Sequence, residues 1–225
     1  MTLVIGVRTK EGCVLIADSA ATSEKGGEID TYINPRKLHY LHAPNRHGQI
    51  LTAFSGSIRF GQLLTHVRPF HDSSGRTVQA SLTAFDNDPY DWTVRYWVAA
   101  ALSYTRHHGL ETSDEHGSHS GEYHLVAIRD RIFYVNDDWH VAEVATPYVA
   151  IGVAAVYAFA ALRLAFWGTD EVTKNVGERK LAIVSGAVEH HCIFVRRPFC
   201  VAHTHLNSSK SRPEVNEVPD EWLRP

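Results

Sequence analysis

Blocks of strand-like segments alternate with pairs of helix-like segments along this chain, and that order limits the folds it can adopt. Apolar, β-branched runs come first, at 2–9, 13–19, 37–41 and 49–55. Apolar residues at near-helical spacing follow, at 57–70 and 90–107. The pattern repeats with strand-like runs at 122–129, 131–136 and 141–144, a second helix pair at 154–167 and 171–189, and a last strand at 192–202. Because helix pairs cannot serve as single crossovers between parallel strands, the sheets should be antiparallel. We predict an α+β fold, a four-layer αββα sandwich of two antiparallel sheets flanked by helix pairs.

Length and composition fit one globular domain. The chain has 225 residues, which is enough for one substantial hydrophobic core and short for two. We place one domain at 1–205 and a polar, proline-containing tail at 206–225, which we expect to be mobile or to lie over a neighbouring molecule. The formal net charge of -3 gives no support for binding to nucleic acid or membrane. No segment resembles a signal peptide or a membrane span, and the three cysteines fit a reducing compartment, so we expect a cytoplasmic protein.

Thr2 is the first candidate for chemistry. If Met1 is removed, this residue carries both a hydroxyl nucleophile and a free α-amine. An α-amine titrates near pH ~7.7–8, so it can act as the base at neutral pH without a histidine. Threonine after the initiator methionine also simply permits removal of that methionine, and alone it indicates no more.

Three downstream positions strengthen the case. They are Asp18 at the end of an apolar run, Lys37 in Pro-Arg-Lys-Leu, and Gly56 in Ser-Gly-Ser. In this order the residues resemble the active site of proteasome β-type subunits and the bacterial HslV protease, which are N-terminal-nucleophile (Ntn) hydrolases. The resemblance covers about 2–202. Taken separately, Asp18 is better explained as a strand-end or turn acid and Lys37 as a solvated surface lysine; their order together favours the active site.

The resemblance implies a role for each residue. Thr2 would attack the peptide bond, and Lys37 would stabilise the developing alkoxide and disfavour a second positive charge on the amine. Asp18 would hold Lys37 in place. The backbone N–H of Gly56, at the start of a helix, would donate to the oxyanion.

Substrate residues follow from the same resemblance. Ala21 and Thr22 match the segment whose backbone pairs with the substrate, with Gly56 on the opposite wall, so an extended peptide would bind as an added strand. Ile58 falls in the specificity pocket, which we expect to be mixed and apolar, together with Ala21, His39 and Phe54. A turn-rich insertion around 24–27 is expected to lengthen a loop near the entrance.

Two positions depart from the family pattern. The turn before the third helix reads Ile-Gly-Val-Ala-Ala at 151–155 and lacks the family's accessory serine. Where the family has an aspartate after the fourth helix, this chain offers Glu189 and His190; we assign Glu189 to the site. These departures resemble outlying bacterial branches, such as the Anbu proteins and the β-proteobacterial proteasome homologue, and the sequence does not choose between them.

The function implied is a threonine endopeptidase without a cofactor, assembled as a homo-oligomeric ring or double ring around its active sites. Its substrate would be a peptide or an unfolded protein, and a ring-shaped ATPase unfoldase is a candidate partner. Two alternatives stay open: a non-catalytic ring subunit, and an Ntn amidase acting on a small amide.

Histidine is frequent, with 15 residues, and two clusters raise the question of a metal. One lies within 107–124 and the other within 190–205, where it includes two cysteines. The spacings fit no compact zinc motif, and strand alternation sends neighbouring side chains to opposite faces, so we predict no metal site. No phosphate-binding glycine loop, dinucleotide fingerprint or serine-elbow motif is present. The aromatic residues of 90–104 are expected in the core or at a subunit interface.

Overall fold

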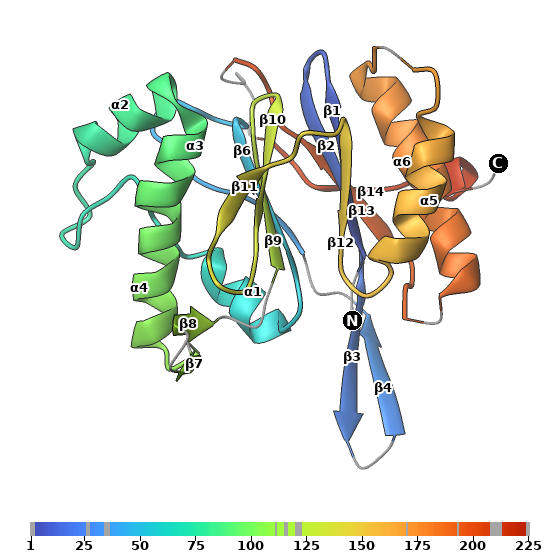
Figure 1. Cartoon of the computed structure of the whole chain (residues 1–225), viewed down its shortest axis with the longest axis horizontal. Coiled ribbons are helices and arrows are strands. Elements are labelled where there is room, and N and C mark those ends of the chain that lie inside the picture. Colours follow the sequence, from blue (N-terminus) through green and yellow to red (C-terminus); the bar gives the residue numbers. More distant parts are fainter. Residues whose placement is uncertain are drawn as a thin grey trace.

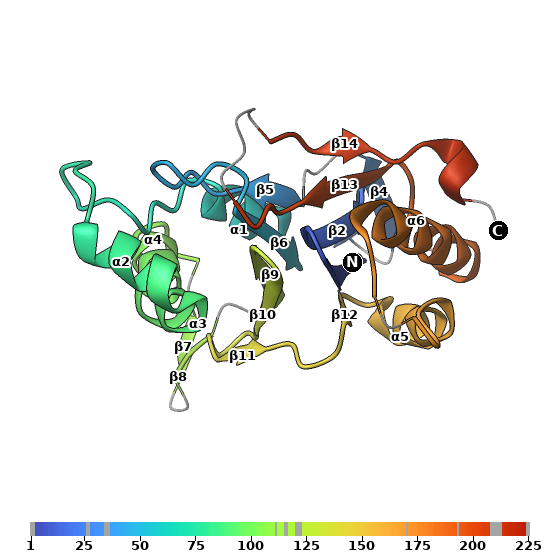
Figure 2. The same ribbon diagram turned by 90° about the horizontal axis from the view of Figure 1, so that it is seen from above.

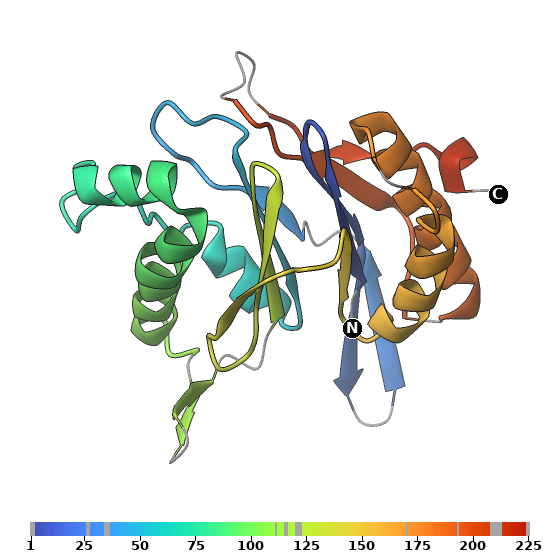
Figure 3. The ribbon, with the colours of Figure 1, turned by 45° about the horizontal axis from the view of Figure 1, so that its top comes forward.

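A computed structural model describes residues 3–25, 28–33, 37–110, 112–114, 117–119, 123–169, 171–192, 194–207 and 213–223. Side chains of 21–33 and 112–119 are not described. These residues form four layers, helices on each side of two stacked sheets, seen in Figure 1 and from above in Figure 2. The oblique view in Figure 3 shows the same order of layers. The predicted αββα sandwich is therefore confirmed.

Each central sheet has five antiparallel strands. The first consists, in spatial order, of β12 (Tyr148–Ile151), β1 (Val4–Thr9), β2 (Gly12–Asp18), β13 (Phe199–His203) and β14 (Asn216–Glu217). The second consists of β11 (Val141–Glu143), β10 (Arg131–Val135), β9 (Tyr123–Ile128), β6 (Ile50–Ser55) and β5 (Leu38–Tyr40). Two short hairpins lie outside these sheets, β3 (Ala20–Lys25) with β4 (Glu28–Ile33), and β7 (Thr112–Asp114) with β8 (Gly117–His119).

Helices cover the outer face of each sheet. On the second sheet lie α1 (Ile58–Leu64), α2 (Gln79–Asn87), α3 (Pro89–Trp92), the π-helix η1 (Thr93–Val98) and α4 (Ala99–His107). On the first sheet lie α5 (Ala155–Ala165) and α6 (Lys174–His191), and the 3-10 helix η2 (Asp220–Leu223) is near them. None of the described helices is long and apolar enough to cross a membrane.

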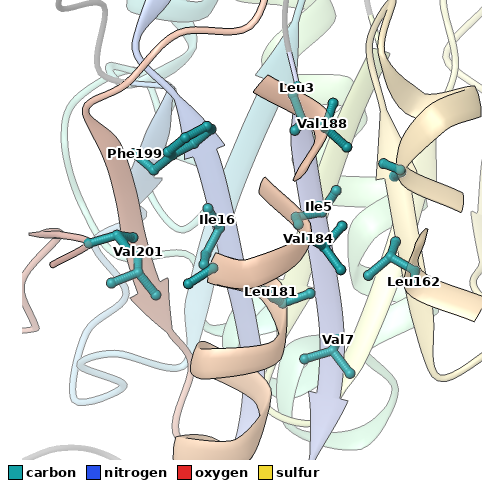
Figure 4. Close-up of a cluster of buried hydrophobic side chains, with 14 of the residues drawn as sticks. Leu3, Ile5, Val7, Ile16, Leu162, Leu181, Val184, Val188, Phe199 and Val201 are labelled. Atoms are coloured by element: carbon teal, nitrogen blue, oxygen red, sulfur yellow. The ribbon is translucent and has the colours of Figure 1, made fainter. Parts of the chain in front are cut away.

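Alternation along the strands explains why two sheets stack. On β1, Ile5 and Val7 face α5 and α6, as does Leu3 before the strand (Figure 4). Val4 instead belongs to the core between the two sheets. A strand with apolar side chains on both faces must be covered on both, by helices on one side and by a sheet on the other.

The expected elements differ from the observed ones in several places. Helix 57–70 ends at Leu64, where the Thr65 hydroxyl donates to the Gln62 carbonyl at 2.7 Å. The strand expected at 192–202 begins only at Phe199, because Pro198 has no N–H to donate to a ladder. Helix α2 and strand β12 were not predicted. The first is mostly polar, and the second lies in an apolar run that continues into α5.

The C-terminal tail packs on its own chain. Strand β14 pairs with β13, and Val218 and Leu223 are buried. A Cβ added at Gly186 of α6 would lie 2.3 Å from the Leu223 carbonyl oxygen, so η2 is in close contact with that helix. The described residues 213–223 are thus packed against β13 and α6 of their own chain, whereas contact of the tail with a neighbouring molecule stays a prediction.

Of the insertion expected around 24–27, the described residues 24 and 25 lie at the end of β3, paired with Ile29 and Glu28 of β4. The hairpin projects from the layered body (Figure 1), with Ala21 paired with Tyr32 and Thr22 with Thr31. Residues 26 and 27 lie outside the described part of the chain. The described residues of this segment therefore belong to a protruding hairpin rather than to a simple loop.

Candidate active site

Three strands of the first sheet bring the start of β1 next to residues far away in the sequence. Val4 pairs with Ala17 of β2 on one side and with Ile151 of β12 on the other. The start of β1 and the ends of β2 and β12 thus meet at one edge of the sheet. Asp18 ends β2 at this edge. Thr2, which lies outside the described residues, precedes this start of β1 in the sequence.

A buried ion pair joins the two sheets at this edge. The Lys37 Nζ lies 2.7 Å from Asp18 Oδ1, and the two residues are 2% and 1% exposed. The same Nζ donates to the Ala20 carbonyl at 2.5 Å. Lys37 directly precedes β5 of the second sheet, so the pair fixes that strand to the end of β2. The structure therefore brings together two of the predicted catalytic residues.

The Asp18 carboxylate also holds the beginning of the described chain. The Leu3 N–H donates to Oδ1 at 2.8 Å, and the Ala20 N–H donates to Oδ2 at 3.2 Å. The Asp18 N–H in turn donates to the Leu3 carbonyl at 3.1 Å. With Lys37, three donors serve this carboxylate. The hydrogen bond from Leu3 to Asp18 was not predicted, although Leu3 directly follows the proposed nucleophile Thr2 in the sequence.

Burial shifts the protonation of both members of the pair. It raises the pKa of the Asp18 carboxyl and lowers the pKa of the Lys37 ammonium, because each charge loses stabilising water. The opposite charge and the hydrogen bonds described above act against both shifts. Ionisable groups perturbed in this way are concentrated at functional sites, although structural ion pairs share the property.

Gly56 lies between β6 and α1. Its φ of 128° falls in the region that favours glycine, and the residue is exposed. Leu38 pairs with Ala53 in the β5–β6 ladder. Continuing that register places Lys37 level with Phe54, two residues before Gly56, or ~7 Å along the strand. The predicted oxyanion donor thus directly follows the strand that lies next to Lys37.

The predicted specificity residues have different environments. His39 stacks on Phe54 with ring centroids 6.1 Å apart, while Ile58 is half-buried at the start of α1. The Ala21 side chain is outside the described set. His39 also lines a pocket of 570 Å³ along β5, formed by 38–42, His47, Gly48, Thr65 and 213–215. Phe54 and Ile58 do not line this pocket.

The turn at 151–155 lies at the same edge as the Asp18–Lys37 pair. It follows Ile151, which pairs with Val4, and Gly152 has a φ of 101°. Val153 is exposed and Ala154 is buried. No hydroxyl stands in this turn, so any serine-like contact must come from another group.

Glu189, the predicted counterpart of the family's aspartate, is bound to Arg197. Both of its carboxylate oxygens accept from Arg197, whose N–H, Nε and Nη2 lie at 2.9, 3.0 and 2.8 Å. A second carboxylate, that of Asp220, lies 2.9 Å from Arg197 Nη1. The Ser19 N–H donates to the Arg196 carbonyl at 3.3 Å, so this segment runs beside the end of β2. Arg197 was missed by sequence reasoning, since its pairing depends on the chain returning after α6.

His124, from the first histidine cluster, lies in the core. It is stacked on Phe60 and Trp139 and contacts Trp97 edge-on, at centroid distances of 5.4, 6.0 and 5.9 Å. Neither ring nitrogen has a hydrogen-bond partner among the described residues, and burial lowers the pKa of His124 to about 3. In the described part of the chain, no three His, Cys, Asp or Glu side chains form a group that could hold a metal ion.

The four layers are those of the predicted αββα sandwich, and the chain superimposes on solved structures that share this fold. Anbu from Hyphomicrobium sp. strain MC1, as its Gly-1 mutant, superimposes with a TM-score of 0.69 at 15% identity, over 99% of this chain and 90% of that one. Anbu from Yersinia bercovieri, described as an ancestral beta-subunit, gives 0.65 at 14% identity, over 98% and 88%. BPH from Thiobacillus denitrificans, solved in complex with epoxomicin, gives 0.64 at 20% identity, over 92% and 100%. No family model and no curated protein sequence matches this chain. The likeness to these outlying bacterial proteins is one of fold.

Proposed function

We propose that this protein is a threonine peptidase in which Thr2, exposed by removal of Met1, is the nucleophile. One observation carries the proposal: Leu3, the next residue in the sequence, donates its N–H to the buried Asp18 carboxylate, which also binds Lys37. Chain continuity therefore ties the predicted nucleophile to a charged pair of the kind that active sites use.

The chemistry needs no group beyond those of the chain, the substrate and water. The Thr2 hydroxyl oxygen forms a bond to the scissile carbonyl carbon while its proton passes to the Thr2 α-amine. The carbonyl oxygen becomes an oxyanion, to which the Gly56 N–H would donate. The C–N bond then breaks as the leaving amine takes the proton from the α-ammonium. Water, deprotonated by the same amine, hydrolyses the resulting ester and restores the hydroxyl.

Lys37 would act electrostatically. Its ammonium is held by Asp18 and the Ala20 carbonyl, so its position is fixed before the reaction begins. A fixed positive charge in a dry site stabilises a developing alkoxide more than the same charge would in water. It also disfavours a second proton on the Thr2 amine, which keeps that amine available as a base.

An extended peptide is the proposed substrate. In the described residues β3 is paired with β4 alone, and Ala21 and Thr22 lie on this strand. A peptide placed between β3 and Gly56 would add as a further strand. We propose that assembly into a ring restricts access to peptides and unfolded proteins, with a ring-shaped ATPase unfoldase as a candidate partner. We place the activity in the cytoplasm, where the three cysteines, none of which forms a disulfide, would stay reduced.

A non-catalytic ring subunit is the second candidate, and two observations favour it. The turn at 151–155 has no hydroxyl, and the Glu189 carboxylate is bound to Arg197. These two positions are where the family has its accessory serine and the aspartate that orients the threonine, and both differ in this chain. Under this alternative the Asp18–Lys37 pair has only a structural role.

Hydrolysis of a panel of fluorogenic peptides distinguishes the two candidates. Wild type should release the fluorophore and Thr2→Ala should not, while Thr83→Ala, which changes an exposed threonine of α2, should match wild type. Equal rates for Thr2→Ala and wild type would remove Thr2 from the mechanism. Turnover of single-residue amides but not of longer peptides would indicate the amidase instead.

A further inference from the structure

Two tyrosine rings lie near the candidate active site, and the proposed chemistry does not use them. Tyr123 begins β9 and Tyr134 lies on β10. Their rings are stacked, with centroids 6.0 Å apart and an angle of 18° between the ring planes. Tyr134 pairs with Leu125, two residues after Tyr123, so the two tyrosines are diagonal neighbours on one face of the second sheet. We call them the tyrosine pair.

The tyrosine pair faces the space between the two sheets. Tyr123 lies opposite Ser55, and residues directly opposite each other in a ladder point to the same face. Two residues further along these strands, Leu125 lies opposite Ala53, and both belong to the core between the sheets. Tyr134 packs against the same core. The tyrosine pair therefore lies where this core ends, next to Ser55.

One ring of the pair is accessible to a ligand. Tyr123 is 40% exposed, whereas Ser55 opposite it is 6% exposed and Leu125 is fully buried. An aromatic side chain has ~150–250 Å² of surface, so the exposed part of Tyr123 amounts to roughly 60–100 Å². Burial raises the pKa of Tyr134, so the ring beside it is uncharged at neutral pH. The accessible surface is thus aromatic and neutral.

The order of the strands places the tyrosine pair beside the predicted oxyanion donor. In the second sheet, β6 lies between β5 and β9. Lys37 directly precedes β5, Gly56 directly follows β6, and Tyr123 begins β9. Figure 1 shows the start of β9 at the same end of the sandwich as the start of β1, and β12 of the first sheet contacts β9. The tyrosine pair therefore lies on the side of Gly56 that is away from Lys37.

A substrate whose scissile carbonyl lies at Gly56 has one residue on each side of the bond. The predicted specificity residues His39 and Phe54 belong to β5 and β6, on the Lys37 side, so they would contact the residue before the bond. The residue after the bond then lies toward β9. We propose that the tyrosine pair binds the side chain that follows the scissile bond and favours an aromatic side chain there. This inference rests on the proposed peptidase function and names the class of peptide that the site prefers.

Ring stacking is the physical basis of this preference. A third ring placed edge-on or offset against Tyr123 would be stabilised beyond the effect of the area that it buries. A methyl side chain at the same position buries little area and cannot stack. We therefore expect a preference of about 10-fold for phenylalanine over alanine after the scissile bond.

The first test measures binding without catalysis. A saturation-transfer NMR titration of Thr2→Ala compares the tripeptide amides Phe-Ala-Ala and Ala-Ala-Ala, which represent the fragment after the cleaved bond. The phenylalanine peptide should bind about 10-fold more tightly. In the same background, Tyr123→Ser should abolish this difference and Tyr123→Phe should keep it. Equal affinity of the two peptides for Thr2→Ala, or an unchanged preference in Tyr123→Ser, would overturn the proposal.

A matched control separates the tyrosine pair from other exposed tyrosines. Tyr90 in α3 is 39% exposed, close to the 40% of Tyr123, and it lies in the outer helical layer. Tyr90→Ser in the Thr2→Ala background should keep the preference for the phenylalanine peptide. Circular dichroism checks that each variant is folded. Because the preference is a ratio measured within one variant, a general loss of stability does not change it.

The second test uses the ester formed on Thr2. Phenylalanine amide or alanine amide is added during turnover of a fluorogenic peptide, and its amine attacks the ester carbonyl in place of water. The Thr2 oxygen leaves and regains a proton, and mass spectrometry measures the new peptide bond. Wild type should form about 10-fold more product with phenylalanine amide, and Tyr123→Ser about equal amounts of both.

The outcomes of the second test separate the two proposals. Equal products in wild type, or more product with arginine amide than with phenylalanine amide, would contradict the tyrosine pair as an aromatic site. No turnover of any fluorogenic peptide by wild type would count against the peptidase. In that case the tripeptide titration of Thr2→Ala still decides whether the tyrosine pair selects an aromatic side chain.

Discussion

Removing one charge of the Asp18–Lys37 pair should destabilise the protein strongly. Lys37→Met keeps the approximate length of the side chain but leaves a buried carboxylate with two backbone N–H donors and no counter-charge. Breaking a buried pair in this way costs about 3–5 kcal/mol. A domain of this size has roughly 5–15 kcal/mol of stability in total. The variant should therefore fold, but with a large part of its stability lost.

Removing both charges should restore much of that loss. In Asp18→Asn/Lys37→Met the remaining amide oxygen can still accept from the Leu3 N–H, and no uncompensated charge is left inside. Urea unfolding of wild type, both single variants and the double variant at pH 7.5 gives the coupling energy, which we expect to be at least ~2 kcal/mol. Lys10→Met is the control, because Lys10 pairs with Glu171 at the exposed surface, and it should cost less than ~1 kcal/mol.

The same double variant separates folding from catalysis. It should be folded yet fail to hydrolyse peptides, because the positive charge proposed to stabilise the alkoxide is absent. Additive effects of the two substitutions on stability would refute the coupled buried pair. Full turnover by the folded double variant would remove Lys37 from the mechanism.

Three further predictions concern other sites. The pKa of His124 falls from 6.5 in the unfolded chain to about 3 in the folded protein, so the neutral, buried imidazole stabilises the fold fully above pH 6.5 and less as the pH falls. Between pH 7.5 and pH 5 the free energy of unfolding should therefore drop by about 2 kcal/mol. In urea unfolding, His124→Leu should show a smaller drop over the same range. Gly61→Ala would place a Cβ 2.0 Å from the Phe54 ring, so it should cost ~1–3 kcal/mol in thermal or urea unfolding and raise KM for peptides. Ala155→Ser, which adds a hydroxyl beside the start of β1, should give peptide turnover equal to or above wild type; a clear loss would argue against a serine-like function for this turn.

The sequence predicted the parts of the fold and site that depend on local pattern. Apolar and β-branched runs were enough to predict β1 and β2, and the resemblance of Asp18, Lys37 and Gly56, in this order, to a known active site selected the buried pair. Contacts made by a returning chain were not predictable in this way. The pairing of Arg197 with Glu189 and the addition of β14 to the first sheet depend on how distant segments meet, which no local spacing encodes.

The most direct test of the central claim is the intact mass of the purified protein before and after incubation with a peptide epoxyketone. This inhibitor needs both the hydroxyl and the free amine of an N-terminal threonine. Our account predicts a chain without Met1 that gains a single adduct, and no adduct in Thr2→Ala. A chain that retains Met1 and gains no adduct would contradict it and favour the non-catalytic ring subunit.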